Sequence, residues 1–148
     1  MEAGRLNAYE AAPEAMRAVQ RVEGYIQQCG LEKSLIELVK MRASQINGCA
    51  YCLDVHSKDA RRAGETEQRL YLLDAWHESS LYTERERAAL AWTEALTRVA
   101  ETHAPDAIYD EVRQHFKDKE LVDLTTLIGL INLWNRLAIG FRYQHPVK

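Results

Sequence analysis

The chain has 148 residues, with 19 Lys or Arg against 22 Asp or Glu, so its formal net charge is −3. A length in this range predicts one domain over residues 1–148, large enough to hold a hydrophobic core without disulfide or metal support. The mild negative charge argues against a nucleic-acid-binding protein, whose phosphate contacts need a basic surface. Seven glycines and three prolines are too few for the frequent tight turns of a β-sandwich or barrel, so helices are expected.

The N-terminal segment, residues 1–16, contains acidic side chains and no apolar run as long as that of a secretory signal, so a cytoplasmic location is expected. In that reducing compartment, three cysteines are more typical of catalysis or metal binding than of a structural disulfide framework. Two of them, Cys49 and Cys52, form a Cys-x-x-Cys pair. We therefore expect the function to depend on this pair.

Hydrophobic periodicity and helix-capping residues predict helices through most of the chain. Pro13 opens the first helix, which stops at Gly30, and the Asn47-Gly48 pair ends the second. The third begins at the cysteines and is stopped by Gly64, and Thr66 caps a short helix after it. Apart from that short helix, the predicted helices cover residues 13–28, 32–46, 49–63, 83–99, 105–116 and 119–140.

The last predicted helix, residues 119–140, is apolar on nearly all sides and must therefore be covered by other elements or by a second subunit. Polar residues interrupt it before it reaches the roughly 20 apolar residues that a membrane span requires. A narrow stripe of small and polar residues runs along it, and we expect this stripe either to line a pocket or to contact a neighbouring subunit. The stripe consists of Thr125, Gly129, Asn132 and Arg136.

The segment from Glu37 to His56 carries the residues of chemical interest. Cys49 and Cys52 stand at the start of a predicted helix, where free backbone N–H groups and the positive end of the helix dipole favour a thiolate. His56 follows Cys52 by four residues, so it shares a helix face with both cysteines. Glu37 shares a face of the preceding helix with Gly48, which directs it towards the cysteines. A carboxylate, an imidazole and two thiols are therefore expected at one site.

These groups suit nucleophilic sulfur chemistry, which needs a nucleophile, a base and a group that orients the base. If one thiolate attacks a peroxide O–O bond it becomes a sulfenic acid, and the second thiol condenses with it to a disulfide. The order of the two cysteines stays open at this point. The spacing to His56 favours Cys52 as the attacking thiolate, whereas the helix dipole favours Cys49, which lies nearer the helix start.

The same segment resembles the core motif of the alkylhydroperoxidase D-like family, within the carboxymuconolactone decarboxylase superfamily. The redox-active members carry a Glu, about a dozen residues later Cys-x-x-Cys, and then x-x-x-His. In this sequence those positions are Glu37, Cys49, Cys52 and His56. The resemblance implies that Cys52 attacks the peroxide, that Cys49 resolves the sulfenic acid, and that Glu37 and His56 relay protons.

Two further stretches, Ser44-Gln-Ile-Asn-Gly-Cys49 and Asn132-Leu-Trp-Asn-Arg136, also resemble the family. Tyr51 departs from it, because some characterised peroxidases of the group have His at that position. The resemblance implies an all-α single-domain bundle of about six to eight helices, with the redox Cys-x-x-Cys at a helix N-terminus. It also implies a homo-oligomer, such as a trimer or a hexamer.

The function that the resemblance implies is an antioxidant dithiol peroxidase, which reduces alkyl or other organic hydroperoxides through a thiol–disulfide cycle. We expect no nicotinamide or nucleotide cofactor, because the sequence has no glycine-rich nucleotide-binding motif, and no metal, because it has neither a second Cys-x-x-Cys nor a His-x-x-x-His. Electrons then arrive by thiol exchange from a reductant, which is a lipoyl-bearing protein, a thioredoxin-like protein or a small thiol. Neither a nucleic acid nor a membrane is expected as a partner.

The cysteine pair is also compatible with several other functions. The two thiols could be buried and inert, or could bind zinc, although the chain has no second Cys-x-x-Cys to complete a four-ligand site. A non-enzymatic redox sensor and a protein-disulfide reductase use the same dithiol. A lactone decarboxylase, the name-giving activity of the superfamily, does not require vicinal thiols. The third cysteine, Cys29, falls on the apolar face of the first helix and is expected in the core.

Overall fold

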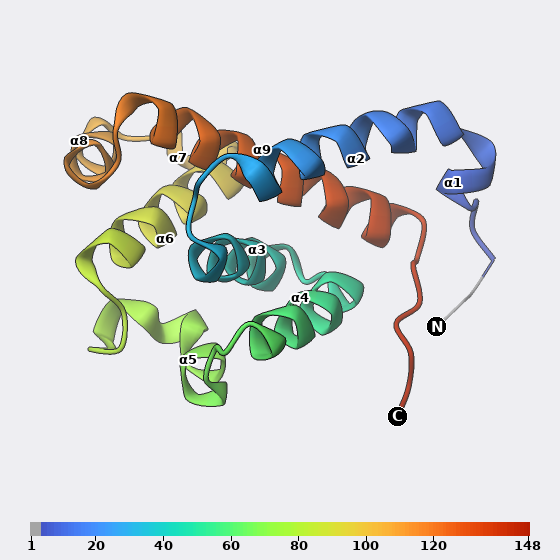
Figure 1. Ribbon diagram of the computed structural model, residues 1–148, viewed down its shortest axis with the longest axis horizontal. Coiled ribbons are helices and arrows are strands. Elements are labelled where there is room, and N and C mark those ends of the chain that lie inside the picture. Colours follow the sequence, from blue (N-terminus) through green and yellow to red (C-terminus); the bar gives the residue numbers. More distant parts are fainter. Residues whose placement is uncertain (1–3) are drawn as a thin grey trace.

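The computed structural model describes residues 4–148, and the regular structure within this range is helical (Figure 1). Residues 1–3 of the N-terminal segment lie outside the described residues. The predicted all-α fold is confirmed. The elements are α1 (Ala8–Ala11), α2 (Pro13–Gln28), α3 (Lys33–Asn47), α4 (Ala50–Arg62), α5 (Glu67–Tyr71), the 3₁₀-helix η1 (Leu73–Glu78), α6 (Glu84–Thr97), α7 (Val99–Thr102), α8 (Asp106–His115) and α9 (Asp118–Gly140).

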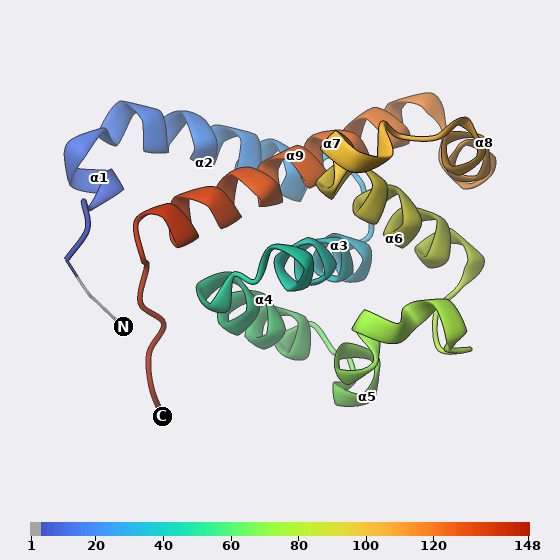
Figure 2. The same ribbon diagram turned by 180° about the vertical axis from the view of Figure 1, so that it is seen from behind.

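Helix α3 lies at the centre of the molecule, between the pair α2 and α9 on one side and α4 on the other (Figure 1). The view from behind shows α6 running from α9 towards the lower layer of α5 and η1 (Figure 2). Helix α3 packs against α4, α6 and α9, and most of its residues from Leu35 to Ser44 are buried. A helix buried on several sides is held in place by all its neighbours, so side chains on α3 have well-defined positions.

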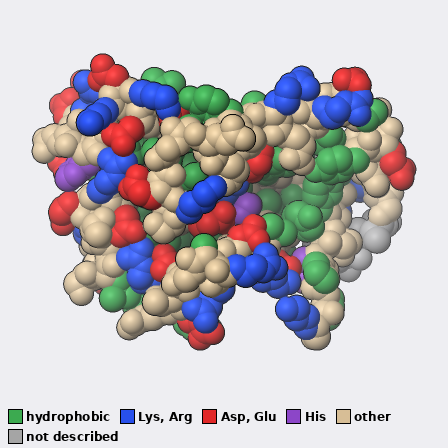
Figure 3. All heavy atoms as spheres, in the orientation of Figure 1, with side chains coloured by type: hydrophobic (Ala, Val, Ile, Leu, Met, Phe, Trp, Pro, Cys, Tyr) green, Lys and Arg blue, Asp and Glu red, His purple; other side chains and the backbone are tan. Residues whose placement is uncertain are grey.

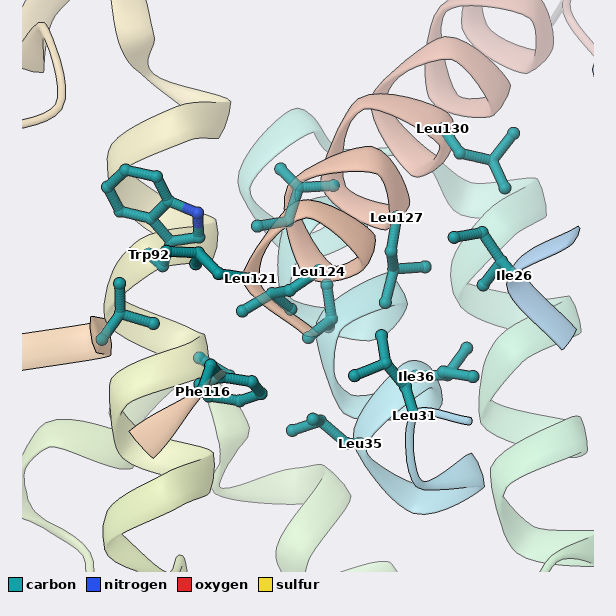
Figure 4. Close-up of a cluster of buried hydrophobic side chains, with 14 of the residues drawn as sticks. Ile26, Leu31, Leu35, Ile36, Trp92, Phe116, Leu121, Leu124, Leu127 and Leu130 are labelled. Atoms are coloured by element: carbon teal, nitrogen blue, oxygen red, sulfur yellow. The ribbon is translucent and has the colours of Figure 1, made fainter. Parts of the chain in front are cut away.

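The main hydrophobic core joins α2, α3, α6 and α9 and the segment that follows α8 (Figure 4). Fully buried aliphatic side chains of this kind stabilise a fold by about 1.5–3 kcal/mol each relative to exposure. Helix α9 contributes more buried residues to this core than any other helix, which explains why its sequence is apolar on nearly all sides. The labelled core residues in Figure 4 are Ile26, Leu31, Leu35, Ile36, Trp92, Phe116, Leu121, Leu124, Leu127 and Leu130.

The small and polar stripe on α9 lines a groove of about 290 Å³ beside the C-terminal end of α6. The hydroxyl of Thr125 accepts a hydrogen bond from Trp92 Nε1 at 3.0 Å, and Asn132 is turned inward and nearly buried. The stripe therefore lines a groove, which is one of the two roles expected for it. Among residues 4–148, no helix is both long enough and apolar enough to cross a membrane.

The helix boundaries differ from the prediction mainly in short elements. The single helix expected after Thr66 is divided at Leu72 into α5 and η1, and the backbone also leaves helical geometry at Ala75, inside η1. Helices α1 and α7 were not predicted, since four residues are too few to show a helical period. These additions bring the described chain to nine α-helices and one 3₁₀-helix, more than the six to eight expected. Cys29 packs partly buried against the core, and its thiol donates to the Ile26 carbonyl.

Candidate active site

The turn between α3 and α4 places both cysteines at the start of α4. Gly48 ends α3 in the left-handed conformation, with φ of 69°, which glycine adopts without the steric cost that a Cβ would add. Cys49 is then the N-cap residue of α4, and its Sγ accepts a hydrogen bond from the Cys52 backbone N–H at 3.3 Å. A two-residue connection thus joins the helix that carries Glu37 to the helix that carries the dithiol.

Cys49 and Cys52 are joined by a disulfide, with their Cα atoms 5.3 Å apart. Both residues are buried, with 1% and 3% of their surface exposed, and they pack against Ala138 of α9 and Tyr143. The spacing therefore allows the disulfide to form inside one helical turn. When the pair is reduced, the N–H group of Cys52 and the start of α4 favour the thiolate of Cys49.

An asparagine network fixes this turn to α9. Asn47, directly before Gly48, donates from Nδ2 to Asn132 Oδ1 and to Asn135 Oδ1, both at 2.9 Å. Asn135 in turn donates to Ser44 Oγ at 3.0 Å, and both Asn135 and Ser44 are buried. The two stretches that resemble the family, one in α3 and one in α9, thus bond to each other. No pattern in the sequence indicated that these two stretches are neighbours.

Glu37 of α3 and His56 of α4 face each other across the two helices. Their closest atoms, Glu37 Oε2 and His56 Nδ1, are 3.2 Å apart, and the two side chains are only 15% and 12% exposed. The distance is that of an ion pair, yet the two groups are not aligned as a hydrogen bond, and both atoms are buried without another partner. Of the four residues expected at one site, the structure brings Glu37 and His56 together beside the dithiol.

A cavity of about 700 Å³ opens in front of these groups, between α2, α3, α4 and α9. Figure 3 shows the molecule hollowed between the pair α2 and α9 and the helix α4, with hydrophobic side chains in the hollow. Cys52, Glu37 and His56 line the cavity, and among the described residues Cys52 is the cysteine that does so. Half of the other lining residues are polar or charged, and the other half are apolar or aromatic. The apolar and aromatic side chains include Tyr9, Tyr51, Val55, Trp134, Ala138 and Tyr143.

Tyr51 and Tyr143 form the part of this wall nearest the disulfide. Their rings meet edge to face, with centroids 5.4 Å apart. The Tyr143 hydroxyl is buried without a hydrogen-bond partner, and burial raises the pKa of this phenol above its usual value. The residue that departs from some peroxidases of the family is therefore a wall residue of the cavity, packed close to the cysteines.

A buried ion pair forms another part of the wall, and sequence reasoning missed it. Lys40 Nζ, with its side chain 3% exposed, binds both carboxylate oxygens of Glu23 at 2.7 and 2.9 Å. Trp134 Nε1 also donates to Glu23. Burial alone would raise the pKa of Glu23, but the hydrogen bonds from Lys40, Gln27 and Trp134 outweigh it and hold the pKa below 4.5. The available signal was that Lys40 follows Glu37 by three residues and so shares its helix face.

Asp59 is a second residue that sequence reasoning missed. It follows His56 by three residues on α4, and the ligating atoms of Glu37, His56 and Asp59 all lie within 4.8 Å of one another. Asp59 also accepts a hydrogen bond from Arg62 at 2.7 Å. An imidazole nitrogen and two carboxylates at these separations can hold a metal cation.

Comparison with known proteins places this site in a family. Residues 13–95, more than half of the chain, match the carboxymuconolactone decarboxylase family, and this stretch contains Glu37, Cys49, Cys52 and His56. The uncharacterized protein YdfG of Bacillus subtilis is 44% identical over 136 residues, which are 92% of each chain.

Two solved structures show how widely the fold is used. A protein of unknown function from Agrobacterium tumefaciens, described as a candidate antioxidant defence protein AhpD, is 52% identical, with a TM-score of 0.95 over 97% of this chain and 99% of that one. The debrominase Bmp8 has the same fold, with a TM-score of 0.83 at 22% identity over 93% of this chain and 74% of that one. The fold alone therefore does not define the reaction. The resemblance to the alkylhydroperoxidase D-like group is confirmed, and the chain belongs to the carboxymuconolactone decarboxylase family.

Proposed function

We propose that the protein is a dithiol peroxidase that reduces organic hydroperoxides. The observation that carries the proposal is the position of Cys52, which faces a cavity beside a carboxylate–imidazole pair while its disulfide partner Cys49 lies behind it. A nucleophile, a base and a resolving thiol are then available to one substrate. A merely structural disulfide would not need Glu37 and His56 in the cavity that Cys52 faces.

In the first step, the Cys52 thiolate attacks the terminal oxygen of the hydroperoxide. A sulfur–oxygen bond forms, the O–O bond breaks, and the two electrons come from sulfur, which becomes a sulfenic acid. The leaving alkoxide takes a proton and departs as the alcohol. We assign delivery of this proton to the pair of His56 and Glu37, since both side chains line the cavity in which the O–O bond is cleaved.

In the second step, the sulfur of Cys49 attacks the Cys52 sulfenic acid. The disulfide forms, and the hydroxyl group takes a proton and leaves as water. In the third step, a dithiol reductant attacks Cys52, because that sulfur faces the cavity, and Cys49 leaves as a thiolate. The N–H group of Cys52 that binds Cys49 Sγ favours this departure. The second thiol of the reductant then releases Cys52 and becomes half of the reductant's own disulfide.

The shape of the site limits which classes of reductant and substrate can reach Cys52. Cys52 is 3% exposed at the wall of a cavity, so the flat surface of a folded protein cannot reach its sulfur. A dithiol on a flexible arm, such as a dihydrolipoyl group, fits the cavity of about 700 Å³. Tyr51 and Tyr143, the aromatic side chains beside Cys52, offer an apolar surface to the organic group of a hydroperoxide, which hydrogen peroxide lacks.

The test is consumption of cumene hydroperoxide by the purified protein with dihydrolipoamide as the reductant. We expect many turnovers with the wild type and none with Cys52→Ser. Cys29→Ser is the matched control, because it removes a thiol that packs against the core and does not line the cavity, and it should keep the wild-type rate.

Two results would overturn the proposal. One oxidation per dithiol without continued turnover would identify a redox sensor. A reversible Cys49–Cys52 disulfide that accepts electrons from disulfide substrates, with no hydroperoxide consumption, would identify a protein-disulfide reductase.

A further inference from the structure

We propose that Glu37, His56 and Asp59 form a zinc site at the floor of the cavity. The three side chains come from two helices, and their ligating atoms lie within 4.8 Å of one another. All three line the same cavity, so an ion in solution has a path to them. The site is distinct from a cysteine-based zinc site, because its ligands are an imidazole and two carboxylates.

Two buried atoms without partners point to a ligand between them. Glu37 Oε2 and His56 Nδ1 are buried, and neither makes a hydrogen bond. Buried polar atoms are normally satisfied, and these two face each other at the distance of an ion pair without aligning as a hydrogen bond, so both can bind one cation between them. A cation held between them satisfies both atoms at once.

The separation of these atoms suits zinc. Zinc binds nitrogen and carboxylate oxygen at about 2.0–2.2 Å, so two ligands in a tetrahedron are about 3.4 Å apart. The observed 3.2 Å between Glu37 Oε2 and His56 Nδ1 is close to that value. The ligating atoms of the three residues are up to 4.8 Å apart, so the third ligand, Asp59, must move towards the other two to bind the same ion. Asp59 is free to do so, because its side chain is 42% exposed and its Arg62 partner is 73% exposed.

The charge and chemistry of the ligands favour zinc over magnesium. Two carboxylates balance the charge of a divalent ion, and a neutral imidazole is a preferred zinc ligand. Magnesium instead requires near-octahedral oxygen coordination and binds imidazole poorly. Three protein ligands leave a fourth zinc position open to the cavity, where water or a ligand can bind.

Zinc at this site would inhibit the reaction, and this consequence rests on the proposed function. The ion occupies the same atoms of Glu37 and His56 to which we assign proton delivery. A zinc-bound imidazole cannot take up or release a proton at the ligating nitrogen. Peroxide turnover should therefore fall as zinc fills the site and recover when a chelator removes the ion.

Zinc binding can be measured independently of peroxidase activity. Zn²⁺ is titrated by calorimetry into the metal-free protein in which the Cys49–Cys52 disulfide is formed. We expect one zinc per chain, and at least about tenfold weaker binding in each of Glu37→Gln and Asp59→Asn. Asp54→Asn is the matched control, because Asp54 lies on the same helix but pairs with Lys58, and it should bind zinc like the wild type. Magnesium should give no comparable heat.

Three outcomes would overturn the site: no zinc binding by the oxidised protein, binding that Asp59→Asn leaves unchanged, or binding only after reduction, which would indicate cysteine ligands. The inhibition is tested by the ratio of turnover rates with and without zinc in each protein. Asp59→Asn should lose this inhibition and Asp54→Asn should keep it. If the protein proves not to be a peroxidase, the titration still decides whether the zinc site exists.

Discussion

Replacing Asn135 with alanine tests whether the asparagine network holds the dithiol turn in place. The Asn135 side chain is buried on α9 and bonds two residues of α3 that directly precede the turn. It accepts from Asn47 Nδ2 and donates to Ser44 Oγ. Alanine removes both bonds while leaving the backbone of α9 helical, because alanine is the most favourable helix residue.

The expected loss of stability follows from what each partner retains. Ser44 is fully buried and loses its donor, which costs about 1–3 kcal/mol. Asn47 keeps its second acceptor, Asn132, so its loss is that of one net hydrogen bond, about 0.5–1.5 kcal/mol. Together these two losses lower the free energy of unfolding by about 3 kcal/mol. For a chain of this length, that lowers the melting temperature by about 6–12 °C.

Urea unfolding at a fixed protein concentration measures this change, with Asn135→Ala, Ser44→Ala and the double variant forming a cycle. We expect the double variant to be less destabilised than the sum of the single variants by about 1–2 kcal/mol, since the pair interacts directly. Val122→Ala is the control on α9, because Val122 is 65% exposed, and its effect should stay within about 0.5 kcal/mol. Additive single effects, or a loss below 1 kcal/mol for Asn135→Ala, would refute the reasoning.

Three further predictions concern the turn at Gly48, the ion pair of Lys40 and Glu23, and proton delivery by His56. Gly48→Ala should destabilise the fold by about 1–2 kcal/mol in urea unfolding, because the left-handed backbone strains a Cβ that otherwise meets no atom within 4 Å. The lowered pKa of Glu23 means that its ionised form stabilises the fold above pH 4.5, and that this stability is lost as the pH falls through the folded-state pKa. The acid side of the stability profile should therefore be flatter in Glu23→Gln, and an unchanged profile would contradict the assigned ion pair with Lys40. His56→Ala should lower kcat/KM for cumene hydroperoxide about 100-fold or more, and a wild-type value would remove His56 from the reaction.

Much of the fold could be predicted because it depends on local patterns. The capping box of Thr83 and Glu86 was visible as a spacing of three residues, and both of its hydrogen bonds are present. The turn at Gly48 was likewise visible, since an Asn-Gly pair favours a break between helices. Helix α9 was expected to be buried because its sequence leaves no polar face.

The candidate site was predictable only where its residues are close in the sequence. Glu37 and His56 lie on consecutive helices joined by a short connection, so helical spacing together with the family resemblance suggested that they meet. The bonds of Asn47 to Asn135 and of Lys40 to Glu23 depend on which helices are neighbours in space. Periodicity shows which face of a helix is buried but not which partner covers it, so these contacts required the structure.

The measurement that tests the central proposal most directly is a single turnover without external reductant. Fully reduced protein is mixed with one equivalent of cumene hydroperoxide, the alcohol product is quantified, and the thiols of Cys49 and Cys52 are identified by mass spectrometry. We predict one alcohol per dithiol, a protein lighter by two hydrogens, and a disulfide between Cys49 and Cys52. In Cys49→Ser the same mixing should give one alcohol and a sulfenic acid trapped at Cys52. Disulfide formation without alcohol, or a sulfenic acid found at Cys49 in Cys52→Ser and absent at Cys52, would contradict the account.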